Sequence, residues 1–255
     1  MKCLSLVVPI YNEAPHLARF LEVIDSLDLG SNLEKELIFV DDCSRDNSLS
    51  ILKAFLFKTI QVKILQQPLN QGKGAALRRG FEEASGDWIV VQDADFEYDP
   101  KDLLKLLKVA VEGRADVVFG SRFKKSESQV HRTFHYLVNR LLTAISNILS
   151  GLYLTDMETC YKLFRAPIIQ NVVLESDRFG FEPEITAKIA RLKLNVHEVG
   201  ISYFPRNYLE GKKITWKDGV AALWHLVRFN VILDKKKFFK ASMPEKYLPR
   251  GGQWL

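Results

Sequence analysis

Short apolar runs alternate with amphipathic helical patterns through the first half of the chain. The apolar runs are short and rich in β-branched and aromatic residues, which predicts buried strands at 4–10, 37–40, 62–65, 88–91 and 117–119. Apolar residues at helical spacing between them predict helices at 14–27, 46–57, 74–84 and 101–111. This alternation predicts an α/β fold, in which a mostly parallel sheet carries helices on both faces.

Acidic residues stand directly after two of these predicted strands. Asp42 follows the run 37–40, and Asp93 and Asp95 follow the run 88–91 with Ala94 between them. In an extended chain, residues i and i+2 point to the same side, and parallel sheets bind ligands at the carboxyl ends of their strands. Mg²⁺ in proteins takes one or two carboxylates together with substrate phosphates. The pattern predicts a metal–diphosphate site, the alternative being that Asp-x-Asp merely starts a loop.

The second half of the chain has a different pattern. Apolar residues at helical spacing over 134–153 predict an amphipathic helix that is either buried core or lies in the plane of a membrane surface. Further helices are expected at 183–192 and 216–233, with a strand at 196–203. We expect residues 1–233 to form the domain and residues 234–255 to form a basic, loosely held tail.

The composition of the chain limits the classes of binding partner and the cellular compartment that we expect. The net charge of +5 favours an anionic partner such as a nucleotide, a lipid phosphate or a membrane surface. The sequence has no basic stripe interleaved with aromatic residues, so we expect no nucleic-acid partner. Three cysteines without metal or disulfide spacing favour a reducing compartment. Without a signal peptide or a spanning segment, we expect a cytoplasmic protein, at most peripheral on the cytoplasmic face of a membrane.

Several separated motifs resemble those of one family, in the same order. Residues 8–13 (VPIYNE), 40–44 (VDDCS), 70–76 (NQGKGAA) and 93–95 (DAD) are similar to motifs of the family 2 inverting glycosyltransferases. The branch that contains dolichol-phosphate mannosyltransferase and polyprenyl-phosphate glycosyltransferases is also similar at 120–122, 155–162, 180–184, 203–206 and 211–213. Several motifs in register are a more specific signal than one short motif.

The resemblance implies a GT-A fold, a Rossmann-like and mostly parallel sheet flanked by helices, with C-terminal amphipathic helices. It implies an inverting, metal-dependent transfer of mannose or glucose from GDP-mannose or a UDP-hexose to dolichyl or undecaprenyl phosphate. Mg²⁺ or Mn²⁺ would be held by Asp93, Asp95 and Glu97, the last of which replaces a glutamine common in the branch.

The resemblance also implies roles for other residues. The nucleotide-sugar donor would be bound by Pro9, Tyr11, Glu13, Asp42, Lys73, Asp93, Ala94 and Asp95. A cationic ring for the acceptor phosphate would consist of Arg122, Arg132, Arg206 and Lys212. Asp156 and Glu184 are equal candidates for a general base, although an acceptor phosphate that is already ionised needs none.

Two other functions stay open at this point. The same fold and donor would serve a GT-A glycosyltransferase with a saccharide, protein or other hydroxyl acceptor. A non-enzymatic alternative is a basic binding protein that uses this scaffold for an anionic surface. The Asp93–Asp95 pair argues against the basic binding protein, because these carboxylates would repel phosphates unless a metal ion neutralised them.

Overall fold

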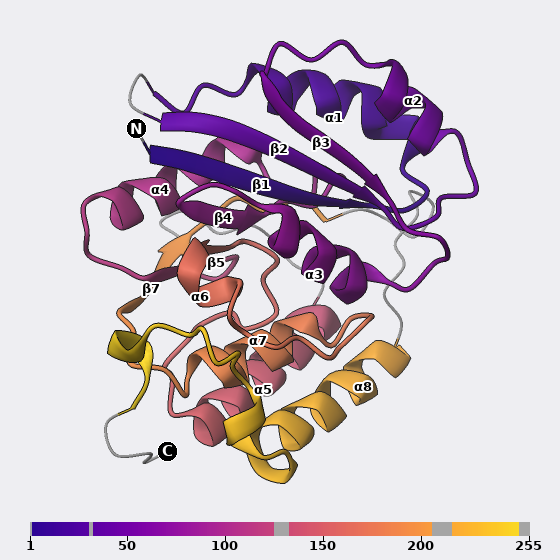
Figure 1. The fold of residues 1–255 in the computed structure, drawn as a ribbon. Helices are drawn as coiled ribbons and strands as arrows, with labels where there is room; N and C mark the ends of the chain where they lie inside the picture. Colours follow the sequence, from indigo (N-terminus) through magenta and orange to yellow (C-terminus); the bar gives the residue numbers. More distant parts are fainter. Residues whose placement is uncertain (1, 31–32, 125–132, 206–215, 250–255) are drawn as a thin grey trace.

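The structure is a computed structural model that describes residues 2–30, 33–124, 133–205 and 216–249 (Figure 1). Its strands are β1 (Lys2–Ile10), β2 (Leu33–Asp41), β3 (Gln61–Gln66), β4 (Trp88–Val91), β5 (Val117–Ser121), β6 (Lys162–Arg165) and β7 (Val196–Gly200). Its helices are α1 (Ala14–Ser26), α2 (Ser48–Ala54), α3 (Lys73–Glu83), α4 (Leu103–Val111), α5 (Thr133–Ser150), α6 (Ala166–Ile169), α7 (Phe181–Ile189) and α8 (Trp216–Val227). Shorter helical turns are η1 (Pro100–Asp102), η3 (Arg228–Ile232), η4 (Lys235–Lys237) and η5 (Glu245–Tyr247).

The described strands form one seven-stranded sheet in the order β3-β2-β1-β4-β6-β5-β7. Strand β6 runs antiparallel to its neighbours β4 and β5, and the other pairs are parallel. Helices lie on both sides of the sheet (Figure 1). The mostly parallel α/β architecture predicted from the alternation of apolar runs and helices is therefore confirmed.

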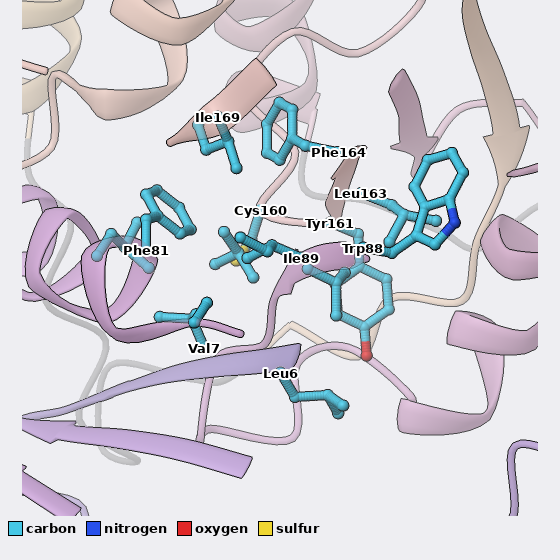
Figure 2. Packing of buried hydrophobic residues seen from close by; sticks show 14 of the residues in the cluster. Leu6, Val7, Phe81, Trp88, Ile89, Cys160, Tyr161, Leu163, Phe164 and Ile169 are labelled. Carbon is cyan, nitrogen blue, oxygen red and sulfur yellow. The ribbon is translucent and has the colours of Figure 1, made fainter. Parts of the chain in front are cut away.

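The central strands are buried on both faces, which is why they read as continuous apolar runs. Figure 2 shows how side chains from four elements meet beside the sheet: Val7 of β1, Phe81 of α3, Ile89 of β4 and Phe164 of β6. Each of these side chains is at most 2% exposed. Burying one such side chain stabilises the fold by about 1.5–3 kcal/mol. This core holds the carboxyl ends of β1, β2 and β4 in fixed positions.

Strand β6 and helix α6 were not predicted from the sequence. Lys162 opens the strand, and its side chain is 0% exposed. Its ammonium donates hydrogen bonds to the carbonyls of Met157 and Thr159 and lies 5.2 Å from the ring centroid of Phe119. Lysine is almost never fully buried. A pattern that treats lysine as a surface residue therefore misses a strand that begins with one.

Helices α5, α7 and α8 pack together on the side of the molecule away from α1 and α2 (Figure 1). Leu142 of α5 joins Met157, Ala222 and Leu226 in a small second core. Other apolar residues of α5 are exposed, Ile148 by 82%. The α5 helix is therefore core on one face and apolar surface on the other. No helix in the described ranges has the length and apolar character to cross a membrane.

The segment 235–249 is packed against the domain, and the expectation of a loosely held tail is wrong for these residues. Phe238 is 0% and Tyr247 4% exposed. The backbone N–H of Val173 donates to the Phe238 carbonyl (2.9 Å), and that of Lys193 donates to the Tyr247 carbonyl (2.7 Å). The many lysines of this segment conceal the few apolar residues that anchor it.

Candidate active site

The loops after β1, β2 and β4 lie side by side because these three strands are parallel neighbours. Each loop contains a non-glycine residue with positive φ: Asn12 (55°), Cys43 (57°) and Phe96 (57°). Elsewhere in the described chain, positive φ occurs at glycines alone. Such residues cost about 1–3 kcal/mol each and gather at functional sites. The backbone therefore marks the same edge of the sheet that the polar residues mark.

The loops after β1 and β2 are tied to each other. The Asn12 N–H donates to Ser44 Oγ (3.1 Å), and Asn12 Oδ1 accepts the Arg45 N–H (2.8 Å). The Glu13 N–H donates to Ser48 Oγ (2.9 Å), and the Glu13 side chain is buried at the start of α1. The predicted donor residues Pro9, Tyr11 and Glu13 thus stand along the edge where these loops meet.

Asp42 holds the turn that precedes α3. Its Oδ1 accepts the Gln71 N–H (2.9 Å), and its Oδ2 accepts from Asn70 Nδ2 (2.6 Å) and from the Gly72 N–H (2.7 Å). Burial raises the pKa of Asp42, and the hydrogen bonds from Gln71 and Gly72 act in the opposite direction. A direct role of Asp42 in donor binding stays a prediction.

Two glycines let this turn pass close to the segment 176–178. A Cβ atom on Gly72, whose φ is +104°, would lie 2.5 Å from the Asp177 carbonyl oxygen. A Cβ atom on Gly74 would lie 2.1 Å from the Ser176 carbonyl oxygen. No real Cβ atom approaches an oxygen so closely, so both positions require glycine. The close approach places Lys73, which lies between the two glycines, over the active-site edge.

The Lys73 cluster consists of Lys73, Asp93 and Glu182. Lys73 Nζ lies 3.1 Å from Asp93 Oδ2 and 3.2 Å from Glu182 Oε1. Burial alone would lower the pKa of Lys73, but nearby negative charges, above all that of Asp93 and also that of Glu182, raise it well above its ordinary value. The ammonium is therefore charged. Glu182 lies in the motif 180–184, but sequence reasoning assigned it no role in the site, since only the fold brings position 182 beside positions 73 and 93.

The two predicted metal ligands of the Asp-x-Asp motif have different surroundings. Asp93 contacts Lys73, whereas Asp95 Oδ1 accepts the Glu97 N–H (3.1 Å). Glu97 Oε2 accepts a hydrogen bond from the Tyr203 hydroxyl (2.9 Å). Across the described residues, no three His, Cys, Asp or Glu side chains gather as a metal-binding set, and the role of Glu97 as a third ligand stays a prediction. Two carboxylates still fit Mg²⁺ or Mn²⁺, which completes its shell with phosphate oxygens and water.

Arg122 and Asp156 form a two-pronged ion pair. Arg122 Nε donates to Asp156 Oδ2 and Nη2 to Oδ1, both at 2.8 Å. The Arg122 side chain is 10% exposed and that of Asp156 0%. Burial would lower the pKa of Arg122, but Asp156 raises it further above its ordinary value. The guanidinium also lies 5.1 Å from the ring centroid of Tyr203, so its plane is fixed on two sides.

Glu184, the other candidate base, lies in the interior. Its side chain is 0% exposed and pairs with the equally buried Lys188 at 2.5 Å. It also accepts the backbone N–H groups of Glu175 (2.7 Å) and Ser176 (2.8 Å). Glu184 therefore supports the segment against which Gly74 packs. Like Asp156, it is already paired with a cation.

Three members of the predicted cationic ring, Arg132, Arg206 and Lys212, lie outside the described residues. Arg122 is the member that the structure describes. Ala94, predicted to line the donor site, is 3% exposed between Asp93 and Asp95.

Comparisons with known proteins agree on one family. The family model "Glycosyl transferase family 2" matches residues 5–173. A dolichyl-phosphate beta-glucosyltransferase of Trichomonas vaginalis is 29% identical over 226 residues, which cover 82% of this chain and 67% of that protein. An undecaprenyl-phosphate 4-deoxy-4-formamido-L-arabinose transferase of Proteus mirabilis is 29% identical over 209 residues, which cover 82% of this chain and 62% of that protein. The chain thus spans about two thirds or less of the length of these curated relatives.

Solved structures show the same fold. Glucosyl-3-phosphoglycerate synthase of Mycobacterium tuberculosis in complex with Mg²⁺ and UDP is similar with a TM-score of 0.66 and 20% identity, over 91% of this chain and 81% of that chain. TarS of S. aureus in complex with UDP is similar with a TM-score of 0.60 and 19% identity, over 92% and 68%. These likenesses show that the sheet and its helices form a GT-A fold.

Proposed function

This chain belongs to glycosyl transferase family 2, and we propose that it transfers a hexose from a nucleotide sugar to a polyprenyl phosphate. The observation that carries the proposal is the closeness of two charged groups, the Lys73 cluster and the Arg122–Asp156 pair. Strands β4 and β5 both run antiparallel to β6 between them, so Asp93 after β4 and Arg122 after β5 lie at the same edge of the sheet. The first group suits a diphosphate and the second a single phosphate. Relatives named for dolichyl and undecaprenyl phosphate support the acceptor class.

On the donor side, we propose that Asp93 and Asp95 hold Mg²⁺ or Mn²⁺ together with the donor diphosphate. The bound metal would supply Lewis-acid stabilisation of the departing nucleotide diphosphate. Lys73 contacts Asp93, so its ammonium would lie beside the same phosphates and add a second positive charge. Solved GT-A neighbours are in complex with UDP and with Mg²⁺ or Mn²⁺, which supports this arrangement. The base, GDP or UDP, and the hexose are not distinguished by these contacts.

On the acceptor side, we propose that Arg122 binds the phosphate of the lipid. Asp156 holds the guanidinium in a fixed plane, which is the geometry that suits phosphate oxygens. An acceptor phosphate is ionised near neutral pH and needs only to be positioned for in-line attack on the anomeric carbon. A hydroxyl acceptor would need a free base. Asp156 and Glu184 are both paired with cations, so neither of these two carboxylates is free to act as such a base.

We also propose that α5, α8 and η3 rest on the membrane that contains the lipid acceptor. Leu141, Val220, Trp224 and Val231 are between 56% and 64% exposed on these elements. Lys236 and its neighbour Lys237 are exposed just beyond η3 and would contact anionic headgroups. The contact would be peripheral and on the cytoplasmic face, where nucleotide sugars are made available to such an enzyme.

A ligand panel tests the donor site. The wild-type protein is heated with UDP, GDP, UDP-glucose or GDP-mannose, each with and without Mn²⁺, because a ligand that binds only the folded state raises Tm. We expect a metal-dependent rise for one nucleotide and its sugar. Asp93→Asn should remove most of that rise, whereas Glu22→Gln, an exposed change on α1, should not.

An acceptor screen with dolichyl and undecaprenyl phosphate follows for the nucleotide sugar that binds. Sugar transfer to either lipid would support the proposal. Transfer to neither lipid, together with transfer to a saccharide or protein hydroxyl, would replace it with the hydroxyl-acceptor function. No binding of any nucleotide at concentrations far above micromolar would contradict the glycosyltransferase site itself.

A further inference from the structure

Glu158 carries a buried carboxyl oxygen whose partner is missing from the described residues. Glu158 lies in the turn between Asp156 and β6. Its Oε1 atom is buried and has no hydrogen-bond partner among the residues that the structure describes. Burial, and then the negative charge of Glu182, raise the pKa of Glu158 to about 7. Buried polar groups in native proteins are nearly always paired. The unpaired Glu158 oxygen therefore suggests that a bound ligand supplies the missing hydrogen-bond donor.

The surroundings of Glu158 show which part of a substrate would meet it. Strand β6 lies between β4 and β5 and runs antiparallel to both, so the turn that leads into β6, which contains Glu158, lies between Asp93 after β4 and Arg122 after β5. Asp93 contacts Lys73 in the proposed diphosphate site, and Arg122 pairs with Asp156 in the proposed acceptor site. The group that lies between a donor diphosphate and an acceptor phosphate is the hexose that moves from one to the other. An unpaired carboxyl oxygen at this place would suit a sugar hydroxyl better than a phosphate, which it would repel.

We propose that Glu158 determines sugar specificity by accepting a hydrogen bond from a hydroxyl group of the transferred hexose. The inference rests on the proposed function, because it places the hexose between the Lys73 cluster and Arg122. The unpaired Oε1 atom can accept a hydrogen bond, so a hydroxyl donor is a suitable partner for it. A site built to bond a substrate hydroxyl rejects an analogue that lacks it, because the protein group is then left buried and unpaired. Glu158 would therefore favour hexoses with a hydroxyl at one ring position.

Deoxyfluoro sugars test this role, because fluorine replaces the hydroxyl without donating a hydrogen bond. The probes are UDP-glucose or GDP-mannose, whichever binds, with its 2-, 3-, 4- and 6-deoxyfluoro analogues, and the nucleoside diphosphate alone. For the wild type, we expect one analogue to bind at least about tenfold more weakly than the parent sugar. Glu158→Met and Glu158→Ala, which lack an acceptor oxygen, should remove this preference while the affinity for the nucleoside diphosphate stays within about twofold.

A control variant and the behaviour of the Glu158 variants decide whether the inference holds. Glu34→Gln, an exposed change on β2, should keep the wild-type preference and serves as the matched control. If Glu158→Ala does not fold, Glu158→Met decides, since methionine has a similar volume and no acceptor oxygen. Unchanged discrimination in a folded Glu158→Met variant would overturn the inference and leave the proposed function intact. Failure of the wild type to bind any of these nucleotides would instead contradict both.

Discussion

Arg122 and Asp156 depend on each other because both are almost fully removed from water. Lysine at position 122 would keep the charge but lose the fork that fits both a carboxylate and a phosphate. For Arg122→Lys, we expect the KM for polyprenyl phosphate to rise at least about tenfold and the free energy of unfolding to fall by about 1–3 kcal/mol. Initial rates with either substrate varied, and urea unfolding, measure both effects.

A control for this change exists on another strand. Arg165 also pairs with a carboxylate, Asp116 at 3.0 Å, and lies 4.5 Å from the Trp88 ring centroid, but it is at the end of β6 and not in the site. Arg165→Lys should lower stability without a change in either KM. A rise in the donor KM alone for Arg122→Lys would show that Arg122 binds the donor and not the acceptor.

Glu158 makes stability depend on pH. Its pKa is raised from 4.5 to about 7 in the folded protein. Between these values the folded state holds a proton that the unfolded state has lost, so stability falls as pH rises through the window and is level above it. Glu158→Gln removes this slope and should be more stable than wild type by about 1–3 kcal/mol at pH 8, with little difference near pH 4.5. Tm measured from pH 4.5 to 8 tests the sign, and equal curves for both proteins would contradict it.

At the scale of elements, the turn before α3 sets the position of Lys73. Gly74→Ala would place a Cβ atom 2.1 Å from the Ser176 carbonyl oxygen, so either the turn or the segment 176–178 must move. We expect a loss of more than about 2 kcal/mol in the free energy of unfolding and weaker binding of the donor. Denaturant unfolding and nucleotide titration measure the two effects.

A second glycine provides the matched comparison. A Cβ atom on Gly219, within α8, would meet nothing nearer than Val138 Cγ1 at 4.0 Å. Gly219→Ala should therefore stabilise the protein by about 0.5–1 kcal/mol, because alanine loses less entropy than glycine in a helix. A Gly74→Ala variant as stable as Gly219→Ala, with normal donor affinity, would show that the turn does not depend on this approach.

The elements that sequence predicted best are those with apolar periodicity. Strand β4 begins and ends where the run 88–91 does, because a strand buried on both faces is apolar throughout. Helix boundaries depend on single side chains and were less accurate. Helix α2 begins at Ser48 rather than at residue 46, since Asp46 Oδ1 accepts the Ser48 N–H (3.0 Å) ahead of the first turn. Charge-rich β6 and the segment 235–249 were misread because a few long-range contacts bury them.

Among the site residues too, those marked by a local sequence pattern were predicted and those set by long-range contacts were not. Asp93, Asp95 and Lys73 were predicted because motifs mark them, and the structure brings Lys73 to Asp93. Glu158 and Glu182 lie within the motif segments 155–162 and 180–184, but the sequence does not show what they contact. Only the folded chain brings Glu182 to Lys73 and leaves a buried oxygen of Glu158 without a partner among the described residues.

At the scale of the whole molecule, the exposed apolar side chains are unevenly placed. Those of α5, α8 and η3 belong to the helical layer below the sheet in Figure 1, away from α1, α2 and β3. Trp224 is 56% exposed, and tryptophan is enriched where proteins meet the headgroup region of a membrane. The acceptor lipid is held in a membrane, so the proposed activity needs a surface of this kind near Arg122.

Trp224→Ser should weaken binding to vesicles that contain anionic lipid and polyprenyl phosphate by about tenfold, since burying one large apolar side chain contributes about 1.5–3 kcal/mol. Sedimentation with vesicles measures the bound fraction. Ile60→Ser is the control, because Ile60 is 98% exposed but lies just before β3, on the other side of the molecule. Activity on a water-soluble, short-chain polyprenyl phosphate should survive Trp224→Ser. Equal loss on the soluble and the vesicle-bound acceptor would mean that Trp224 supports the fold or the site, and not membrane contact.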